Sequence, residues 1–111
     1  MAVHQREVVE VNYLLPNGSF RPHPVIVISN NEIFEIEEIF YGVMLSTKDS
    51  NSEFIFELTD NMMTKPSQRH RSFVKCYLIQ AYSEREIIGR HGQIRKAAFE
   101  ELKAQIIQSL F

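Results

Sequence analysis

The feature that most constrains the fold is the run Val25–Ile28, in which all four residues are apolar and β-branched. Pro22 and Pro24 stand directly before it and favour an extended entry of the chain. A short run of this composition, bounded by prolines, is typical of a strand that is buried on both faces. The sequence therefore predicts a β-rich fold with core residues on both sides of the strand formed by Arg21–Ser29.

Further segments alternate or are apolar enough to form strands of the same sheet. The predicted strands are Glu7–Leu14, Ile39–Ser46, Glu53–Leu58 and Ser72–Ile79. Within the first of these, Val9, Val11 and Tyr13 share one face. A turn is expected at residues 16–18, where Asn-Gly favours positive φ, and the polar residues 47–52 are expected to form a hairpin loop.

Two helices complete the pattern. Asn30 and Asn31 can cap a short helix that runs through Glu38. Gly89 and Gly92 are expected to break the chain before a final helix that starts near Arg95. In that helix one apolar stripe recurs at helical spacing, formed by Phe99, Leu102, Ile106 and Leu110. The fold class is mainly β with a C-terminal helix, and a small curled sheet with the helix on one side satisfies it.

Length and composition indicate one soluble domain spanning residues 1–111. The 111 residues are too few for two ordinary domains, and 44% hydrophobic residues can build a core without disulfides or metal. The single cysteine, Cys76, fits a reducing setting and is expected in the core. Charges near the N-terminus do not fit a signal peptide, and no apolar run could span a bilayer, so a cytoplasmic location without membrane contact is expected. The net charge of −2 argues against a protein that coats nucleic acid generally, but allows a local basic patch.

The order of these segments resembles the PemK/MazF family of toxin–antitoxin ribonucleases. An N-terminal strand and a loop lead to PVIVISNN at Pro24–Asn31, followed by the hydroxyl-rich strand end MLSTK at Met44–Lys48 and by EFIFEL at Glu53–Leu58. A strand beginning at Ser72, a glycine-containing step and an amphipathic helix complete the match, which extends from about Arg6 to Leu110. The resemblance implies an SH3-like barrel that forms a homodimer, cleaves single-stranded RNA without a metal or cofactor, and is blocked by an antitoxin.

Such cleavage uses the neighbouring 2′-hydroxyl of the RNA as nucleophile, and the protein must move protons and stabilise charge on the phosphate. In the family, an arginine that precedes a proline and a hydroxyl residue at the end of the third strand have these roles. The hydroxyl corresponds to Ser46, with Thr47 as the alternative. The arginine corresponds to His23 when counted back from Ser29, and to Arg21 when matched by residue type.

Arg21 and His23 could both face the same groove, because residues two apart on a strand share a face. Arg21 would then hold the phosphate, since its planar guanidinium matches phosphate oxygens. His23 would act as general acid or base, since its unperturbed pKa lies near neutrality. Each of these residues also has an interpretation without a catalytic role. His23 could serve only the turn geometry between its two prolines, and Ser46 could satisfy backbone groups locally at the end of its strand.

Many family members carry an aspartate–glutamine pair in the fifth strand, where this chain has Tyr77 and Leu78. For Tyr77 we expect burial, with stacking on a base or a place in the dimer interface as the alternatives. A cluster of basic residues is the best independent sign of a polyanion partner, and the alternative for it is a solvated loop. Together with Lys48 the cluster forms the predicted RNA-binding set: Lys48, Lys65, Arg69, His70 and Arg71. The alternative function is a barrel of the same family that binds a peptide or nucleic acid without cleaving it.

Overall fold

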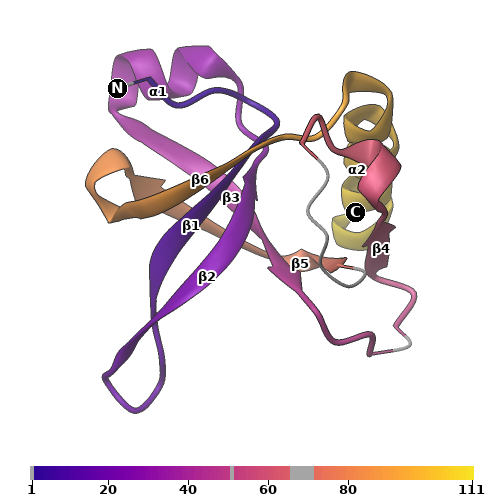
Figure 1. Ribbon diagram of the computed structural model, residues 1–111, viewed down its shortest axis with the longest axis horizontal. Helices are drawn as coiled ribbons and strands as arrows, with labels where there is room; N and C mark the ends of the chain where they lie inside the picture. The colour runs from indigo at the N-terminus through magenta and orange to yellow at the C-terminus, as the bar shows by residue number, and fades with distance from the viewer. Residues whose placement is uncertain (1, 51, 66–71) are drawn as a thin grey trace.

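The computed structural model describes residues 2–50, 52–65 and 72–111. In this part of the chain, six strands form one antiparallel sheet in the order β4-β5-β3-β2-β1-β6 (Figure 1). The strands are β1 (Glu7–Leu14), β2 (Phe20–Val27), β3 (Ile39–Ser46), β4 (Ile55–Leu58), β5 (Ser72–Ser83) and β6 (Ile87–Gln93). The helices are α1 (Asn31–Glu37) and α2 (Lys96–Leu110), with short 3-10 turns at Asp60–Met62 and Glu84–Glu86. The mainly β fold class with a C-terminal helix is confirmed.

The two edges of the sheet come together and close it into a small barrel. Met63, which follows β4, forms an isolated antiparallel bridge with Ile94, which follows β6. The N–H of Thr64 donates to the carbonyl of Gln93 at 2.8 Å, and the N–H of Arg95 donates to the carbonyl of Met62 at 2.6 Å. These bonds satisfy backbone groups that an open edge would leave exposed.

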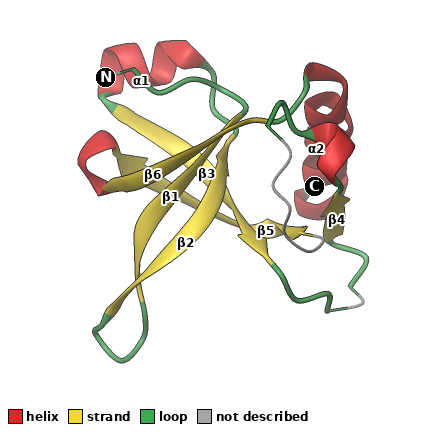
Figure 2. Ribbon diagram, viewed as in Figure 1, coloured by secondary structure: helices red, strands yellow, loops and turns green. Residues whose placement is uncertain are grey.

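The core consists of two hydrophobic clusters on opposite faces of the curled sheet. In β2, Ile26 belongs to one cluster while Val25 and Val27 belong to the other, so the prediction of burial on both faces is confirmed. The first cluster includes Phe99, Leu102 and Ile106 of α2, and the second has Phe34 of α1 packed against it. Figure 2 shows the two helices on different sides of the sheet accordingly.

Local signals explain where several elements begin and end. Asn30 caps α1 by accepting a hydrogen bond from the N–H of Ile33 at 3.1 Å. In the turn between β1 and β2, Gly18 has φ +87° and the side chain of Asn17 accepts from the N–H of Ser19. The predicted turn and the predicted helix cap are both confirmed.

The topology differs from the predicted hairpin at residues 47–52. β3 and β4 are not paired with each other, because β5 lies between them and bonds to both. β3 and β4 are therefore on opposite sides of β5, although they are consecutive in the sequence. Polar loop residues showed where a connection lies but not which strand its ends would bind.

β5 is longer than predicted and changes face within its length. Its register with β3 shifts between Lys75, opposite Met44, and Ile79, opposite Val43. The extra residues of this bulge move Leu78 off the core face, and Ile79 packs against the core instead. Tyr77 is 43% exposed, so the expected burial of this residue is wrong.

The glycine-containing segment before α2 is also more regular than predicted. Gly89 lies inside strand β6, opposite Glu10 of β1, and Gly92 has φ +87° near the end of this strand. Isolated glycines marked an irregularity in a strand and not a break. In α2, Leu102 is fully buried but Leu110, the last residue of the predicted stripe, is 45% exposed.

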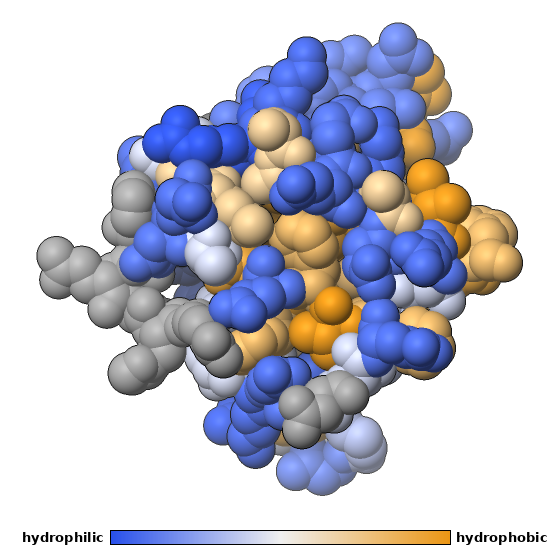
Figure 3. Space-filling view, turned by 90° about the vertical axis from the view of Figure 1, so that its right-hand side faces the viewer, coloured by the Kyte–Doolittle hydropathy of each residue, from blue (hydrophilic) through white to orange (hydrophobic). Residues whose placement is uncertain are grey.

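The outer surface on the side of α2 and β4 is mostly hydrophilic, with hydrophobic side chains showing in separate areas between polar ones (Figure 3). Within the described ranges, no helix is long and apolar enough to cross a membrane. Cys76 is fully buried as predicted, and burial raises the pKa of its thiol to about 11. A buried thiol with this pKa is protonated at neutral pH and unreactive.

Candidate active site

A groove opens where β2 and β3 separate. Among the described residues, β3 pairs with β2 only opposite Val25–Val27. Residues 20–24 of β2 therefore have a strand on one side, β1, and no paired strand of the described chain on the other. Pro22 and Pro24 lie on this free segment, in agreement with their inability to donate to a central ladder. The groove beside this edge has a volume of about 780 Å³.

The groove brings together side chains from distant parts of the sequence. Its walls come from the free half of β2, the end of β3, the segment after β4, and parts of β1, β5 and β6. Among the predicted site residues, those lining it are Arg21, His23, Ser46, Thr47, Lys48 and Lys65. Arg69, His70 and Arg71 lie outside the described residues.

His23 is half-buried, and the pKa of its imidazole is below the ordinary value of 6.5. Burial is the largest cause and the positive charge of Arg21 the second, with Lys75 adding to it. The polar backbone of Leu45 and the negative charge of Glu10 raise this pKa but are outweighed. His23 is therefore neutral at pH 7, and its buried Nδ1 has no hydrogen-bond partner among the described residues.

Ser46 is held in place by a local bond. Its Oγ accepts a hydrogen bond from the N–H of Lys48 at 3.1 Å. A hydroxyl that accepts in this way retains its O–H for donation to a further group. Local capping and a ligand contact are thus compatible roles for this residue, and Thr47 lies exposed beside it on the same groove.

Charge in the groove differs from charge in the whole chain, which is −2. The described lining contains four Lys and Arg side chains, Arg21, Lys48, Lys65 and Lys75, against two carboxylates, Glu10 and Asp60. Glu10 is engaged by His91, whose Nε2 lies 3.9 Å from its Oε1. The described wall of the groove is net positive and suits a polyanion.

Sequence reasoning missed four of these lining residues, which are Glu10, Asp60, Lys75 and His91. Lys75 is the only charged residue in the apolar segment SFVKCYLI, and this exception to the pattern was the available signal. Glu10 gave no such signal, because it lies between Val9 and Val11, where the alternation of β1 already places a polar residue. His91 gave no signal, because its position depends on β6, which was not predicted.

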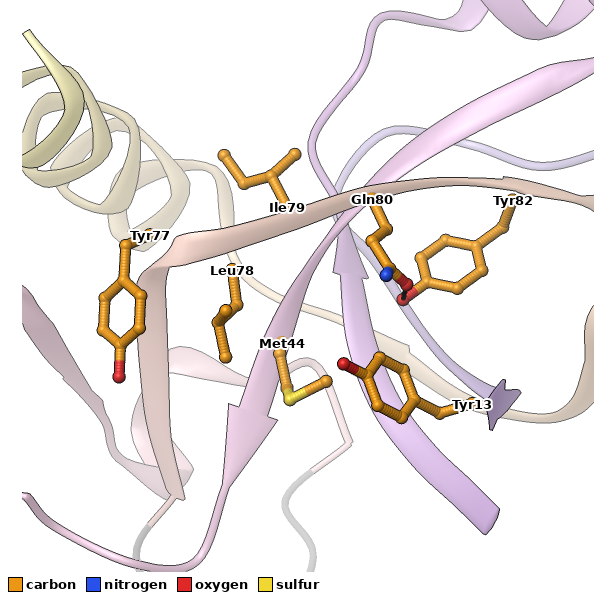
Figure 4. A pocket seen from close by; sticks show the side chains of 7 residues that line it. All are labelled: Tyr13, Met44, Tyr77, Leu78, Ile79, Gln80 and Tyr82. Atoms are coloured by element: carbon orange, nitrogen blue, oxygen red, sulfur yellow. Dashed lines mark hydrogen bonds between the residues drawn. The ribbon is translucent and has the colours of Figure 1, made fainter. Parts of the chain in front are cut away.

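A smaller cavity of about 140 Å³ adjoins the groove, and Met44 lines both. In Figure 4, Met44 and Leu78 point toward the same space, while Ile79 lies on the other side of β5. The hydroxyl of Tyr82 donates to Oε1 of Gln80 at 3.0 Å, and burial raises the pKa of Tyr82 to about 12. Tyr77 and Leu78, at the positions where the resemblance places a polar pair, thus line this cavity together with Met44 and Ile79.

Comparison with protein families shows which family the chain belongs to. The family model described as PemK-like, MazF-like toxin of type II toxin–antitoxin system matches residues 4–110. The chain belongs to this family. The resemblance read from the sequence is therefore confirmed. No curated protein shows significant similarity.

Solved structures of the family have the same fold. An endoribonuclease in complex with its cognate antitoxin from Mycobacterial species is 17% identical, with a TM-score of 0.74 over 98% of this chain and 95% of that one. A MazE-MazF structure from Deinococcus radiodurans is 11% identical, with a TM-score of 0.78 over 99% and 97%. Mycobacterium tuberculosis toxin MazF-mt6 is 10% identical, with a TM-score of 0.69 over 95% and 92%. At these identities the similarity establishes the fold, and the site must be argued from its own residues.

Proposed function

We propose that this protein is the toxin of a toxin–antitoxin pair and a metal-independent endoribonuclease that cleaves single-stranded RNA in the cytoplasm. The observation that carries the proposal is the groove, which gathers Arg21, His23 and Ser46 with further cations in a chain of this family. A groove of about 780 Å³ is large enough to receive a nucleotide and its flanking phosphates.

In the proposed cleavage of RNA, each groove residue has a separate role. The neutral imidazole of His23 accepts the proton of the 2′-hydroxyl while its oxygen attacks the adjacent phosphorus. Arg21 holds a non-bridging phosphate oxygen, and the free O–H of Ser46 donates to the same group, with Thr47 as the alternative donor. The bond from phosphorus to the 5′-oxygen breaks, the 5′-oxygen takes a proton from water, and a 2′,3′-cyclic phosphate remains. Lys48 and Lys65, with the basic residues Arg69, His70 and Arg71, would follow the flanking phosphates.

Two partners belong to this proposal. The structural relatives include an endoribonuclease in complex with its cognate antitoxin, and an antitoxin segment that lies in the cationic groove would exclude RNA. A second copy of the chain is expected to form a homodimer. Size-exclusion chromatography with light scattering tests this, and a monomeric mass at micromolar concentration would exclude a stable homodimer.

The decisive test is incubation of the protein with a long, unstructured RNA in EDTA. Wild type is compared with Arg21→Ala, His23→Ala and Ser46→Ala, each checked for folding by circular dichroism. Loss of cleavage in both His23→Ala and Arg21→Ala would support the two roles proposed for them, whereas loss in only one of these variants would favour the sequence register that contains that residue. Absence of cleavage by folded wild type across varied RNA sequences would reject the nuclease function.

One observation favours a second candidate, a barrel of this family that binds without cleaving. The polar pair found in many relatives is replaced by Tyr77 and Leu78, which line the apolar cavity beside the groove. Gel shifts with single-stranded RNA at two salt concentrations separate binding from no interaction, since phosphate contacts weaken as salt rises.

A further inference from the structure

Lys75 lies in an unusual place for a lysine. It is half-buried in β5, between the buried residues Val74 and Cys76. Strands bond to it on both sides, since Lys75 is paired with Met44 of β3 and Ile55 of β4. Its backbone is therefore fixed in the sheet, and the ammonium group can move only within the reach of its own side chain.

The strand registers place Lys75 on the same face as the candidate catalytic residues. Met44, opposite Lys75, is also opposite Val25 of β2, so these three side chains share a face. Ser46 follows Met44 by two residues, and His23 precedes Val25 by two, which puts both on this face as well. Lys75, His23 and Ser46 all line the groove.

The charge of Lys75 is not neutralised within the described chain. No carboxylate of the described residues forms an ion pair with it, although Glu7, Glu10, Glu84 and Glu100 form such pairs elsewhere. A cation that lines the groove without an ion-pair partner is available to an anionic ligand. Its charge acts on His23 from the side of β5 while Arg21 acts from β2, so two cations converge on this histidine.

We infer that Lys75 binds a non-bridging oxygen of the scissile phosphate and stabilises the negative charge that develops there in the transition state. The inference rests on the proposed function and deepens it. In the register counted back from Ser29, His23 occupies the position where the resemblance places an arginine, so this position of β2 carries no permanent cation. Lys75 restores a charge at that point, from a different strand, while leaving His23 free to act as the base. The ammonium keeps its protons throughout, and no bond to it forms or breaks.

The test replaces Lys75 by methionine, which keeps a long unbranched side chain without charge, and by arginine, which keeps the charge. Single-turnover cleavage of single-stranded RNA is expected to fall about 100-fold or more in Lys75→Met, as when one electrostatic contact to a transition state is lost. Lys75→Arg should recover part of the rate. Lys96→Met, an exposed lysine at the start of α2, is the matched control and should leave the rate unchanged. Thermal melts verify that all variants are folded.

Binding provides a second readout that does not depend on cleavage. The probe is the same RNA with 2′-deoxyribose at the cleaved nucleotide, so the nucleophile is absent. In Lys75→Met, the slope of log affinity against log salt is expected to fall by about 0.7, the contribution of one phosphate contact in a single strand. A cleavage rate within about threefold of wild type, or a folded Lys75→Arg no better than Lys75→Met, would overturn the inference. If wild type cleaves no RNA, the proposed nuclease function fails, and an unchanged salt slope in Lys75→Met then rejects the phosphate contact as well.

Discussion

The ring of Tyr13 meets the ring of His23 edge-on, with centroids 5.5 Å apart and planes inclined by 65°. Val11 is directly opposite His23 in the ladder between β1 and β2, so Tyr13 is its diagonal neighbour on the same face. Edge-on aromatic pairs of this kind contribute about 0.5–1.5 kcal/mol. Tyr13 therefore restricts the orientation of the imidazole at the groove.

We expect Tyr13→Ala to lower the rate of RNA cleavage about 3- to 10-fold, because an energy of that size corresponds to such a factor when it holds the base in position. Tyr13→Phe keeps the ring and should retain nearly the full rate. The measurement is single-turnover cleavage with each variant. Equal rates for Tyr13→Ala and wild type would show that the ring contact does not orient His23.

The protonation of His23 should govern activity at low pH. Since the pKa of His23 lies below 6.5, cleavage is expected to be constant near pH 7 and to fall as the pH drops through this lowered value. Arg21→Ala removes a neighbouring positive charge and should raise the pKa of His23. Lys96→Ala should not change this pKa, because Lys96 of α2 neither lines the groove nor contributes to the shift. NMR titration of the imidazole measures both shifts, and a pKa unchanged by Arg21→Ala would contradict the role of Arg21.

The same shift makes a prediction about stability. The unfolded chain binds a proton at His23 near pH 6.5, whereas the folded chain binds it only at lower pH. Between these two values the unfolded state holds more protons, so the free energy of unfolding should fall as the pH is lowered. This contribution should disappear in His23→Gln. Urea titrations of the two proteins at pH 7 and pH 5 provide the comparison.

Gly42 of β3 leaves no room for a side chain. A Cβ at this position would lie 2.8 Å from Cγ2 of Val25 and 3.3 Å from Cε2 of Tyr82. Gly42→Ala is therefore expected to lower the free energy of unfolding by about 1–3 kcal/mol, as overpacking of a core does. In β6, Gly89 would meet only ordinary contacts at 3.6 Å, so Gly89→Ala is the control and should change stability by less than about 1 kcal/mol. Chemical denaturation measures the free energy of unfolding of both variants, and equal losses in Gly42→Ala and Gly89→Ala would contradict the packing argument.

The two leucines of α2 should differ in their importance. Leu102 is fully buried in the cluster between the sheet and the helix, whereas Leu110 is 45% exposed. We expect Leu102→Ala to cost about 2–5 kcal/mol through lost burial and the cavity that remains. Leu110→Ala, the same chemical change near the end of the helix, should cost less than about 1 kcal/mol. Similar midpoints of urea denaturation for the two variants would show that α2 is not anchored as described.

The sequence was sufficient to predict features that depend on neighbouring residues. The β-branched run Val25–Ile28, the turn at Gly18 and the cap at Asn30 follow from local sterics and hydrogen bonding, and their positions are confirmed. The family could also be predicted, because the order of such segments is a property of the sequence.

Pairing between distant strands was decided only by the tertiary structure. Nothing local indicated that β5 would lie between β3 and β4, or that a bulge would turn Leu78 outward and Ile79 inward. Side-chain alternation defines two faces for each strand, but the neighbours of a strand depend on how the whole sheet packs its core. For the same reason the sequence proposed Arg21, His23 and Ser46 as separate candidates, whereas Lys75 was found only when the sheet brought it to the groove that these residues share.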